Sequence, residues 1–218
     1  MAASGKIVDL RNLLAERFPH PALSATAWLT TGLSSLDGVM GGGLPKGGIT
    51  ELINPRISAG SASLIAALLH RAHQSGYFVA LIDGRDSFDP EPLGNACLRH
   101  LLWTRCGKAT EAMKAADFLL RDGNFPLVIL DLVLNSTAEL RKIPQTSWYR
   151  LQRLVEPTST AFLVMSRQSM VSSAQVKLIL ENSWDLESFE QEKAHGRMQM
   201  RLQRSHLSER GMAKAEAS

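Results

Sequence analysis

Four short apolar runs recur along the chain, and segments with helical spacing separate them. The runs are Ile49–Ile53, Tyr77–Asp83, Pro126–Asp131 and Thr160–Met165. Apolar runs of this length without alternation are typical of strands buried on both faces of a sheet. The intervening helical segments are Ser63–Gln74, Thr110–Arg121 and Trp148–Val155. This order predicts an α/β fold with a largely parallel, twisted sheet flanked by helices.

The first 27 residues have a different pattern. Residues 6–18 carry apolar side chains at three- and four-residue steps, namely Ile7, Leu10, Leu13, Leu14 and Phe18, which predicts a short amphipathic helix. Pro19 and Pro21 then indicate a linker, because proline cannot continue a helix. The helix either packs on a neighbouring subunit or protein or folds back on its own domain. We therefore expect an N-terminal helix and linker (1–27), a core domain (28–204) and a flexible basic tail (205–218).

The last strand of the core alternates between polar and apolar side chains. Period two over Arg197–Arg204 places Met198, Met200 and Leu202 on one face. The polar residues Arg197, Gln199, Arg201 and Gln203 lie on the other. We expect this half-exposed strand to pair antiparallel with residues 176–180 and form a C-terminal hairpin.

Composition and charge narrow the class of protein. The chain has 218 residues, of which 44% are hydrophobic, so one well-packed domain is expected and disorder is excluded. Two cysteines cannot build a disulfide framework, and charges interrupt every apolar run near the N-terminus, which predicts a cytoplasmic protein without a signal peptide. No apolar stretch is long enough to span a bilayer, so no membrane partner is expected.

The positive charge gathers at the C-terminal end. The net charge is 24 − 21 = +3, whereas residues 193–218 alone hold six Lys/Arg against two Glu, a balance of +4. The basic residues of the strand and its approach are Lys193, Arg197, Arg201 and Arg204. They form either a solvated edge that resists aggregation or a contact with a protein partner or single-stranded DNA.

The loop between the first buried run and the next helix is where a phosphate-binding loop, G-x-x-x-x-G-K-[ST], would lie. It reads Asn54, Pro55, Arg56, Ile57, Ser58, Ala59, Gly60 and Ser61. Asparagine stands at the first glycine, alanine at the second and glycine at the lysine, so only Ser61 fits. Sliding by one residue restores Gly60 as the second glycine but puts Ser61 at the lysine.

This degenerate loop has no ammonium group in either register, and we expect neither ATP nor Mg²⁺ as a cofactor. Asn54 could adopt a left-handed conformation in place of the first glycine. Arg56 could supply positive charge from the other side of the loop, and the helix dipole at Ser61 would still attract an anion.

Three blocks together resemble the nucleotide-binding core of the bacterial RecA family. They are Thr31–Asp37 (TGLSSLD), Gly42–Leu52 (GGLPKGGITEL) and Leu81–Pro90 (LIDGRDSFDP), and their order and spacing agree with the family. The resemblance covers residues 28–204 and implies a RecA-like P-loop NTPase fold. It also matches Asp131 to the Walker B acid and places Arg204 near a family lysine that reaches the neighbouring subunit's nucleotide.

Two departures from the family pattern argue against enzymatic activity. Asp83 matches the aspartate that precedes the family's water-activating glutamate by two residues, but the glutamate position is Arg85, which cannot act as a general base. The segment that matches the first DNA-binding loop, Asn135–Ser147, is shortened, and no glycine-rich second loop follows Met165. We expect no ATP turnover and no strand-exchange filament.

A small RecA-like chain with an eroded phosphate loop and a C-terminal hairpin is similar to the ImuA family. That resemblance implies a non-hydrolysing adaptor in DNA repair and SOS-type translesion synthesis, with RecA or an ImuB-like polymerase accessory protein as partner. Two alternatives remain open: an unconventional ATPase acting on DNA with Arg56 in place of the lysine, and a cell-division inhibitor of SulA type.

Other polar residues have structural interpretations. Without the lysine, we expect Asp131 to hydrogen-bond loop backbone or Ser61, and Asp83 and Asp89 to be structural as well. His70 and His73 could form a metal pair only with a third ligand, which the sequence does not offer, so no metal site is expected. The tryptophans are expected in the core or at an interface; they are Trp28, Trp103, Trp148 and Trp184.

Overall fold

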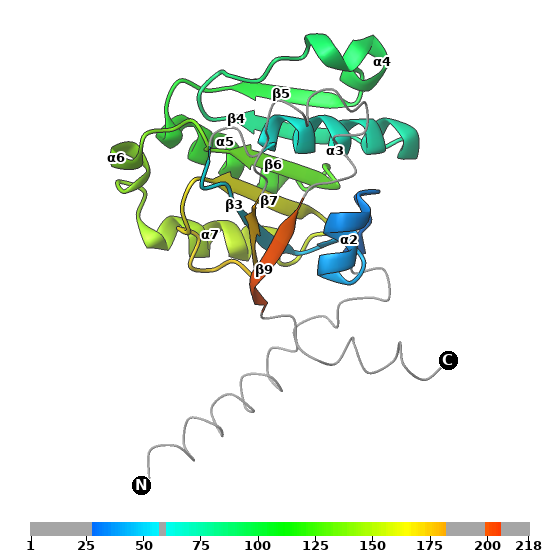
Figure 1. Ribbon diagram of the computed structural model, residues 1–218. Helices are drawn as coiled ribbons and strands as arrows, with labels where there is room; N and C mark the ends of the chain where they lie inside the picture. The colour runs from blue at the N-terminus through cyan, green and yellow to red at the C-terminus, as the bar shows by residue number, and fades with distance from the viewer. Residues whose placement is uncertain (1–27, 57–59, 182–198, 206–218) are drawn as a thin grey trace, which may run out of the picture.

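The computed structural model describes residues 28–56, 60–181 and 199–205, and they form a seven-stranded sheet with helices on both faces (Figure 1). The strand order is β5-β4-β6-β7-β3-β8-β9, and all neighbours are parallel except β8 and β9. The predicted α/β class with a mostly parallel sheet is confirmed.

The strands follow the predicted runs closely. Their bounds are β1 (Trp28–Leu29), β2 (Leu44–Pro45), β3 (Gly48–Ile53), β4 (Val79–Asp83), β5 (Leu101–Arg105), β6 (Leu127–Asp131), β7 (Ala161–Ser166), β8 (Val176–Leu180) and β9 (Met200–Ser205). Strands β1 and β2 form a separate antiparallel ribbon. Strand β5 was not predicted, because its residues at the sheet edge are half-exposed and carry no continuous apolar signal.

The helices complete the fold. They are α2 (Ser34–Met40), α3 (Ser61–Ser75), η1 (Glu91–Leu93), α4 (Gly94–Leu98), α5 (Ala109–Asp122), α6 (Thr137–Leu140) and α7 (Gln145–Val155). The helices predicted at α3, α5 and α7 are present, and the first two end on Gly76 and Gly123 with φ of 71° and 68°. These left-handed caps explain why glycine follows each helix.

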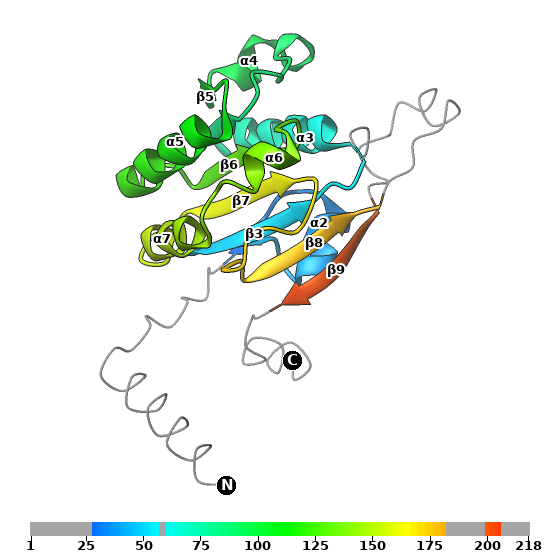
Figure 2. The same cartoon turned by 90° about the vertical axis from the view of Figure 1, so that its left-hand side faces the viewer.

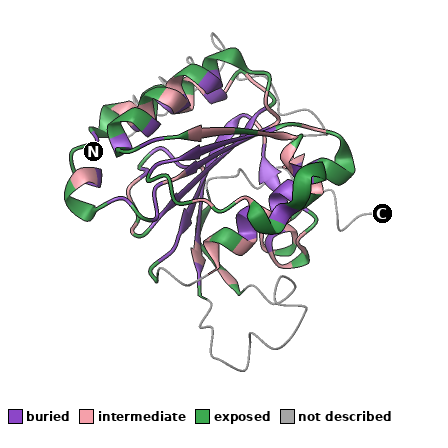
Figure 3. Ribbon diagram, turned by 90° about the horizontal axis from the view of Figure 1, so that it is seen from above, coloured by how far each residue is buried: buried purple, intermediate pink, exposed green. Residues whose placement is uncertain are grey.

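The sheet separates two apolar clusters. Helices α2, α3 and α4 pack on one face, with Leu36, Leu68 and Cys97 in that cluster, whereas α5, α6 and α7 pack on the other, around the fully buried Trp148. Figure 2 shows the two helical layers, and Figure 3 shows that the central strands are buried between them. The sheet is therefore held rigid from both sides, and its carboxyl edge is a fixed platform for loops.

The predicted C-terminal hairpin is present as the antiparallel pair β8–β9, but its faces differ from the prediction. Lys177 pairs with Arg204 while Leu178 pairs with Leu202, so the register skips one residue of β9. The skipped residue is Gln203, so the bulge puts Arg204 on the same face as Arg201, whereas strict alternation would place it with Met200 and Leu202. Met200 and Leu202 precede the bulge and share a face, but only Met200 packs on the core, since Leu202 is 42% exposed.

Several predictions fall outside the described residues. They are the N-terminal helix and linker (1–27), Met198, Trp184 and the tail that follows Ser205. Among the described residues, no helix is both long and apolar enough to cross a membrane.

A buried ion pair fixes the loop between β7 and β8. Glu51 on β3 is fully buried, and its Oε2 lies 2.6 Å from Nζ of Lys177 on β8. Its Oε1 accepts hydrogen bonds from the backbone N–H groups of Met170 (2.6 Å) and Val171 (2.9 Å), and Lys177 also donates to Ser169 Oγ at 2.7 Å. One carboxylate thus joins β3, β8 and the loop that leads into β8.

We predict that Lys177→Met lowers the free energy of unfolding by about 3 kcal/mol, because it leaves a buried carboxylate without its cation. The matched control is Arg121→Met, which removes an exposed partner of Asp117 and should cost less than about 1 kcal/mol. Urea unfolding of both variants measures the difference. Equal losses would contradict this role for the buried pair.

Candidate functional site

The segment interpreted from the sequence as a degenerate phosphate loop lies at the junction between β3 and α3. Asn54 is fully buried, its backbone N–H donates to Ser166 O at 2.7 Å, and both polar atoms of its side chain have no hydrogen-bond partner. Its φ is not positive, since Asp86 is the one non-glycine residue with positive φ in the described chain. The left-handed conformation considered for Asn54 is therefore absent.

The remainder of the loop divides into exposed and undescribed parts. Pro55 and Arg56 are exposed, Ile57, Ser58 and Ala59 lie outside the described residues, and Gly60 precedes α3 with φ of 99°. Arg56 does not line the cavity described next.

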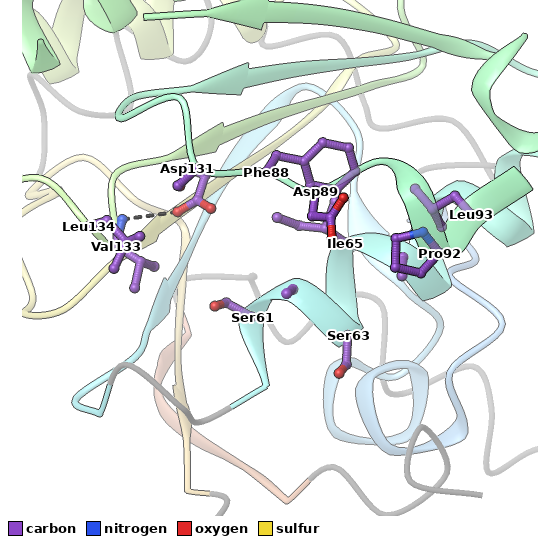
Figure 4. A pocket seen from close by; sticks show the side chains of 13 residues that line it. Ser61, Ser63, Ile65, Phe88, Asp89, Pro92, Leu93, Asp131, Val133 and Leu134 are labelled. Atoms are coloured by element: carbon purple, nitrogen blue, oxygen red, sulfur yellow. Dashed lines mark hydrogen bonds between the residues drawn. The ribbon is translucent and has the colours of Figure 1, made fainter. Parts of the chain in front are cut away.

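A cavity of about 430 Å³ opens between the first turns of α3, the loop after β4 and the end of β6 (Figure 4). Three serine hydroxyls and two carboxylates contribute polar groups, from Ser61, Ser63, Ser87, Asp89 and Asp131. The other walls are apolar and include Ile65, Phe88, Pro92, Leu93, Val133 and Leu134. No lysine or arginine lines it within the described part of the chain.

Asp131 ends β6 at the inner side of this cavity. Its Oδ1 accepts a hydrogen bond from the backbone N–H of Val133 at 2.9 Å (Figure 4). This is one of the two structural contacts considered for it from the sequence. Burial raises the pKa of Asp131 to about 6, and the charge of Asp83 adds to the increase, while the bond from Val133 opposes it. The site is therefore unfavourable to further negative charge.

Asp83, at the end of the adjacent strand β4, anchors the loop that follows it. The carboxylate is buried and accepts from the backbone N–H groups of Arg85 (3.2 Å), Ser87 (2.8 Å) and Phe88 (2.8 Å). The Ser87 hydroxyl also donates to Asp83 Oδ1, at 3.4 Å. These bonds hold Ser87 and Phe88 where they line the cavity. Asp89 accepts a local bond from Glu91 N at 3.0 Å.

Arg85, which the resemblance matched to the family's glutamate, is directed away from the cavity. Its Nη1 donates to the backbone oxygen of Gly107 at 3.0 Å, and the residue is exposed and does not line the cavity. Beside it, Arg105 forms a bidentate pair with Asp86 (2.5 and 2.8 Å) and lies 4.9 Å over the Trp103 ring. Sequence reasoning missed this pair because no motif marks it.

Hydrogen bonds to two distant segments hold the residues that the resemblance matched to the first DNA-binding loop. Asn135 is buried and donates to Gly84 O at 2.9 Å, and Glu139 on α6 accepts from Ala109 N at 2.6 Å. That bond is the main reason why the pKa of Glu139 is lowered. Residues 135–147 therefore form α6 and the start of α7 rather than an extended loop.

The predicted basic face is present in part. Arg201 and Arg204 are exposed on β9, and Arg201 Nε lies 2.6 Å from Glu181 Oε1. Lys193 and Arg197 lie outside the described residues. The face is not part of the cavity, so the two candidate regions are separate.

The two histidines of α3 do not form a metal site with any third residue in the described segments. His70 Nδ1 contacts Ala66 O at 2.9 Å, and the His73 ring lies 5.2 Å from that of His100. Of the tryptophans, Trp148 is fully buried, whereas Trp28 and Trp103 are half-buried at the edge of the core.

A parallel sheet carries a strand–loop–helix junction at β3 and an acid at the end of β6, with β7 between these two strands. This arrangement is typical of the RecA-like class of P-loop folds. The sequence profile of the RecA N-terminal domain family matches residues 21–146. The chain therefore belongs to this family.

Curated RecA proteins are similar to about half of the chain. The match to the RecA protein of Desulfotalea psychrophila is 33% identical over 121 residues, covering 54% of this chain and 34% of the relative. The match to RecA of Clavibacter michiganensis is 35% identical over 111 residues, covering 49% and 30%. The matched region thus spans about a third of the length of these relatives.

We predict that Asp131→Asn stabilises the protein at pH 8 by about 2 kcal/mol, from roughly 1.4 kcal/mol per pKa unit reduced for partial exposure. A carboxyl whose folded pKa is raised binds more protons in the native state, so its ionisation costs stability as the pH rises from about 4 to above 6. The asparagine should therefore lose its advantage near pH 4.

Thermal unfolding between pH 4 and 8 tests this, with the exposed Asp122→Asn as control. A pH-independent difference between Asp131→Asn and the wild type would show that the carboxylate is not penalised by burial.

Proposed function

We propose that this protein is a RecA-like adaptor in DNA repair that docks on RecA or on an ImuB-like polymerase accessory protein and does not hydrolyse ATP. The ImuA-type role in SOS-induced translesion synthesis is the specific form of this proposal. It is supported by family membership, by the degenerate loop and by the hairpin with its exposed arginines.

The observation that carries the proposal is the charge of the cavity. A nucleoside triphosphate brings three to four negative charges, which P-loop proteins offset with a lysine and a metal ion. Here two carboxylates and no cation line the cavity within the described residues, and Asp131 already resists ionisation. The residues present do not fit a bound triphosphate.

Arg85, at the position that the resemblance matches to the family's glutamate, also supports a protein without ATP turnover. The guanidinium is always protonated and cannot accept a proton from water. It is also turned toward Gly107 O. No carboxylate in this position is available to orient an attacking water molecule, so the proposal excludes turnover even if nucleotide were retained.

One feature favours the alternative of an unconventional ATPase. Ser61 and Asp131 face the same cavity (Figure 4), and a hydroxyl and a carboxylate are suitable Mg²⁺ ligands. A hydrolysis assay with and without single-stranded DNA separates the two functions. We expect no turnover above background; turnover that disappears in Asp131→Ala would establish the ATPase instead.

The docking part of the proposal predicts that purified RecA binds this protein and that Arg204→Glu weakens binding at least tenfold, because arginine is a frequent anchor at interfaces. The control is Arg153→Glu on α7, which changes the same charge on an exposed helix of the core. Surface plasmon resonance measures both. Unchanged affinity in Arg204→Glu would leave the basic strand as a solvated edge.

A further inference from the structure

A second cavity, of about 380 Å³, lies on the other flank of α3. It is formed by the segment that leads into α2 and by the second half of α3. The residues that matter are Thr31, Gly32, Leu33, His70, Arg71 and Gln74. Only Ala67 completes the lining among the described residues, so this pocket shares no residue with the cavity at Asp131.

Arg71 is the one residue with a fixed positive charge in this lining. Its Nε has no contact with solvent and no hydrogen-bond partner, and no ion pair joins it to any acid in the described segments. A buried N–H donor without an acceptor carries an appreciable energetic cost. A ligand that accepts from this guanidinium would remove the cost.

Asp37 on α2 does not form an ion pair with Arg71 among the interactions of the described residues. Its carboxylate accepts instead from Thr31 N (3.0 Å), Thr31 Oγ1 (2.6 Å) and Gly32 N (3.0 Å). Asp37 thus holds the loop that lines the pocket.

The loop is shaped around the arginine. Gly32 has φ of +77°, and a Cβ built on it would lie 3.0 Å from Cδ and 3.4 Å from Nε of Arg71. Only glycine combines this backbone with the close approach. A side chain at position 32 would therefore crowd Arg71, and glycine leaves the space that the arginine side chain occupies.

Tyr77, which follows α3, is a second buried donor without a partner. Its hydroxyl has no hydrogen-bond partner. Burial raises the pKa of Tyr77, although the charge of Arg71 acts against this increase, so the hydroxyl remains protonated at neutral pH. Tyr77 does not line the pocket, so Arg71 is the group that would meet a ligand there.

We propose that this pocket binds a carboxylate, presented by an acidic side chain of a partner protein. The planar guanidinium is suited to the two oxygens of a carboxylate. A single recessed cation is a poor match for a nucleic-acid backbone, which is bound by several exposed cations at once. The volume and the apolar wall at Leu33 leave room for the methylene groups that carry the carboxylate.

The anion site depends on Arg71 and Gly32 alone, whereas the assignment of its occupant to a partner protein rests on the proposed adaptor function. The test must therefore separate the two. N-acetylglutamate amide serves as the probe for one acidic side chain, and N-acetylglutamine amide is its neutral counterpart.

Titration of the full-length protein, followed through the Arg71 Nε–Hε resonance, should give a saturable shift with the glutamate probe. The glutamine probe should bind at least tenfold more weakly. Arg71→Gln should abolish binding to the probe, while Arg153→Gln on the opposite helical layer should retain it. Thermal unfolding of Arg71→Gln checks that the variant is folded.

Equal binding of the charged and neutral probes, or probe binding retained by Arg71→Gln, would overturn the site. A larger Arg71 shift with inorganic phosphate or a 20-nucleotide single strand would overturn the choice of carboxylate. If the probe binds through Arg71 and wild-type protein captures no RecA, the pocket stands while the adaptor function in that form fails. If Arg71→Gln loses the probe but captures RecA like the wild type, the assignment of the carboxylate to that partner is overturned.

Discussion

The pairing of β4 with β6 is the constraint on which the candidate site depends. Their parallel register sets Asp83 directly opposite Asp131 at the carboxyl edge of the sheet. Two carboxylates on neighbouring strands repel each other, and the structure distributes the cost unequally. Asp83 accepts three backbone hydrogen bonds from the following loop, whereas Asp131 accepts one. Burial raises the pKa of Asp131 to about 6, and the charge of Asp83 adds to the increase. Among the described residues, no lysine or arginine lines the cavity at this edge to offset the charge of a polyphosphate.

This electrostatic pattern separates the fold from the chemistry associated with it. The scaffold retains the strand–loop–helix junction, and Ser61 still faces Asp131 across the cavity. Among the described residues, the cavity lacks a lysine or arginine. Arg85 lies in the loop after β4, but its guanidinium donates to the backbone oxygen of Gly107 in another loop. A domain can keep its fold while the catalytic residues associated with that fold are absent. Family membership therefore establishes the architecture of this chain and leaves its chemistry to the particular side chains that line its cavities.

The sequence was sufficient for the fold wherever burial produces a repeating pattern. Strands β3, β4, β6 and β7 are buried throughout or nearly so and appear as apolar runs, and α3 and α5 end where glycine follows. Strand β5 escaped prediction because an edge strand is only partly covered. The skipped residue in β9 also left no trace, since the polar alternation in sequence is unbroken through Leu202.

For the site, motif spacing located Asp131 and the degenerate loop but not the cavity, whose walls at Leu93 and Leu134 come from connecting segments. Pairs of residues that are distant in sequence could not be predicted either, because no motif links them. Glu51 and Lys177 meet only because β3 and β8 are neighbours in the sheet, and Arg71 is significant only because Gly32 lies against it. Contacts between residues distant in sequence need the folded geometry.

The loop that Glu51 holds has a mechanical consequence. Displacing residues 169–171 would break the buried hydrogen bonds from the backbone N–H groups of Met170 and Val171 to Glu51. Water does not reach this site to replace them, and the Glu51–Lys177 pair lies beside them. This junction is consequently rigid and does not act as a hinge. A partner bound to the β8–β9 hairpin would therefore move the hairpin and β3 together with the rest of the sheet.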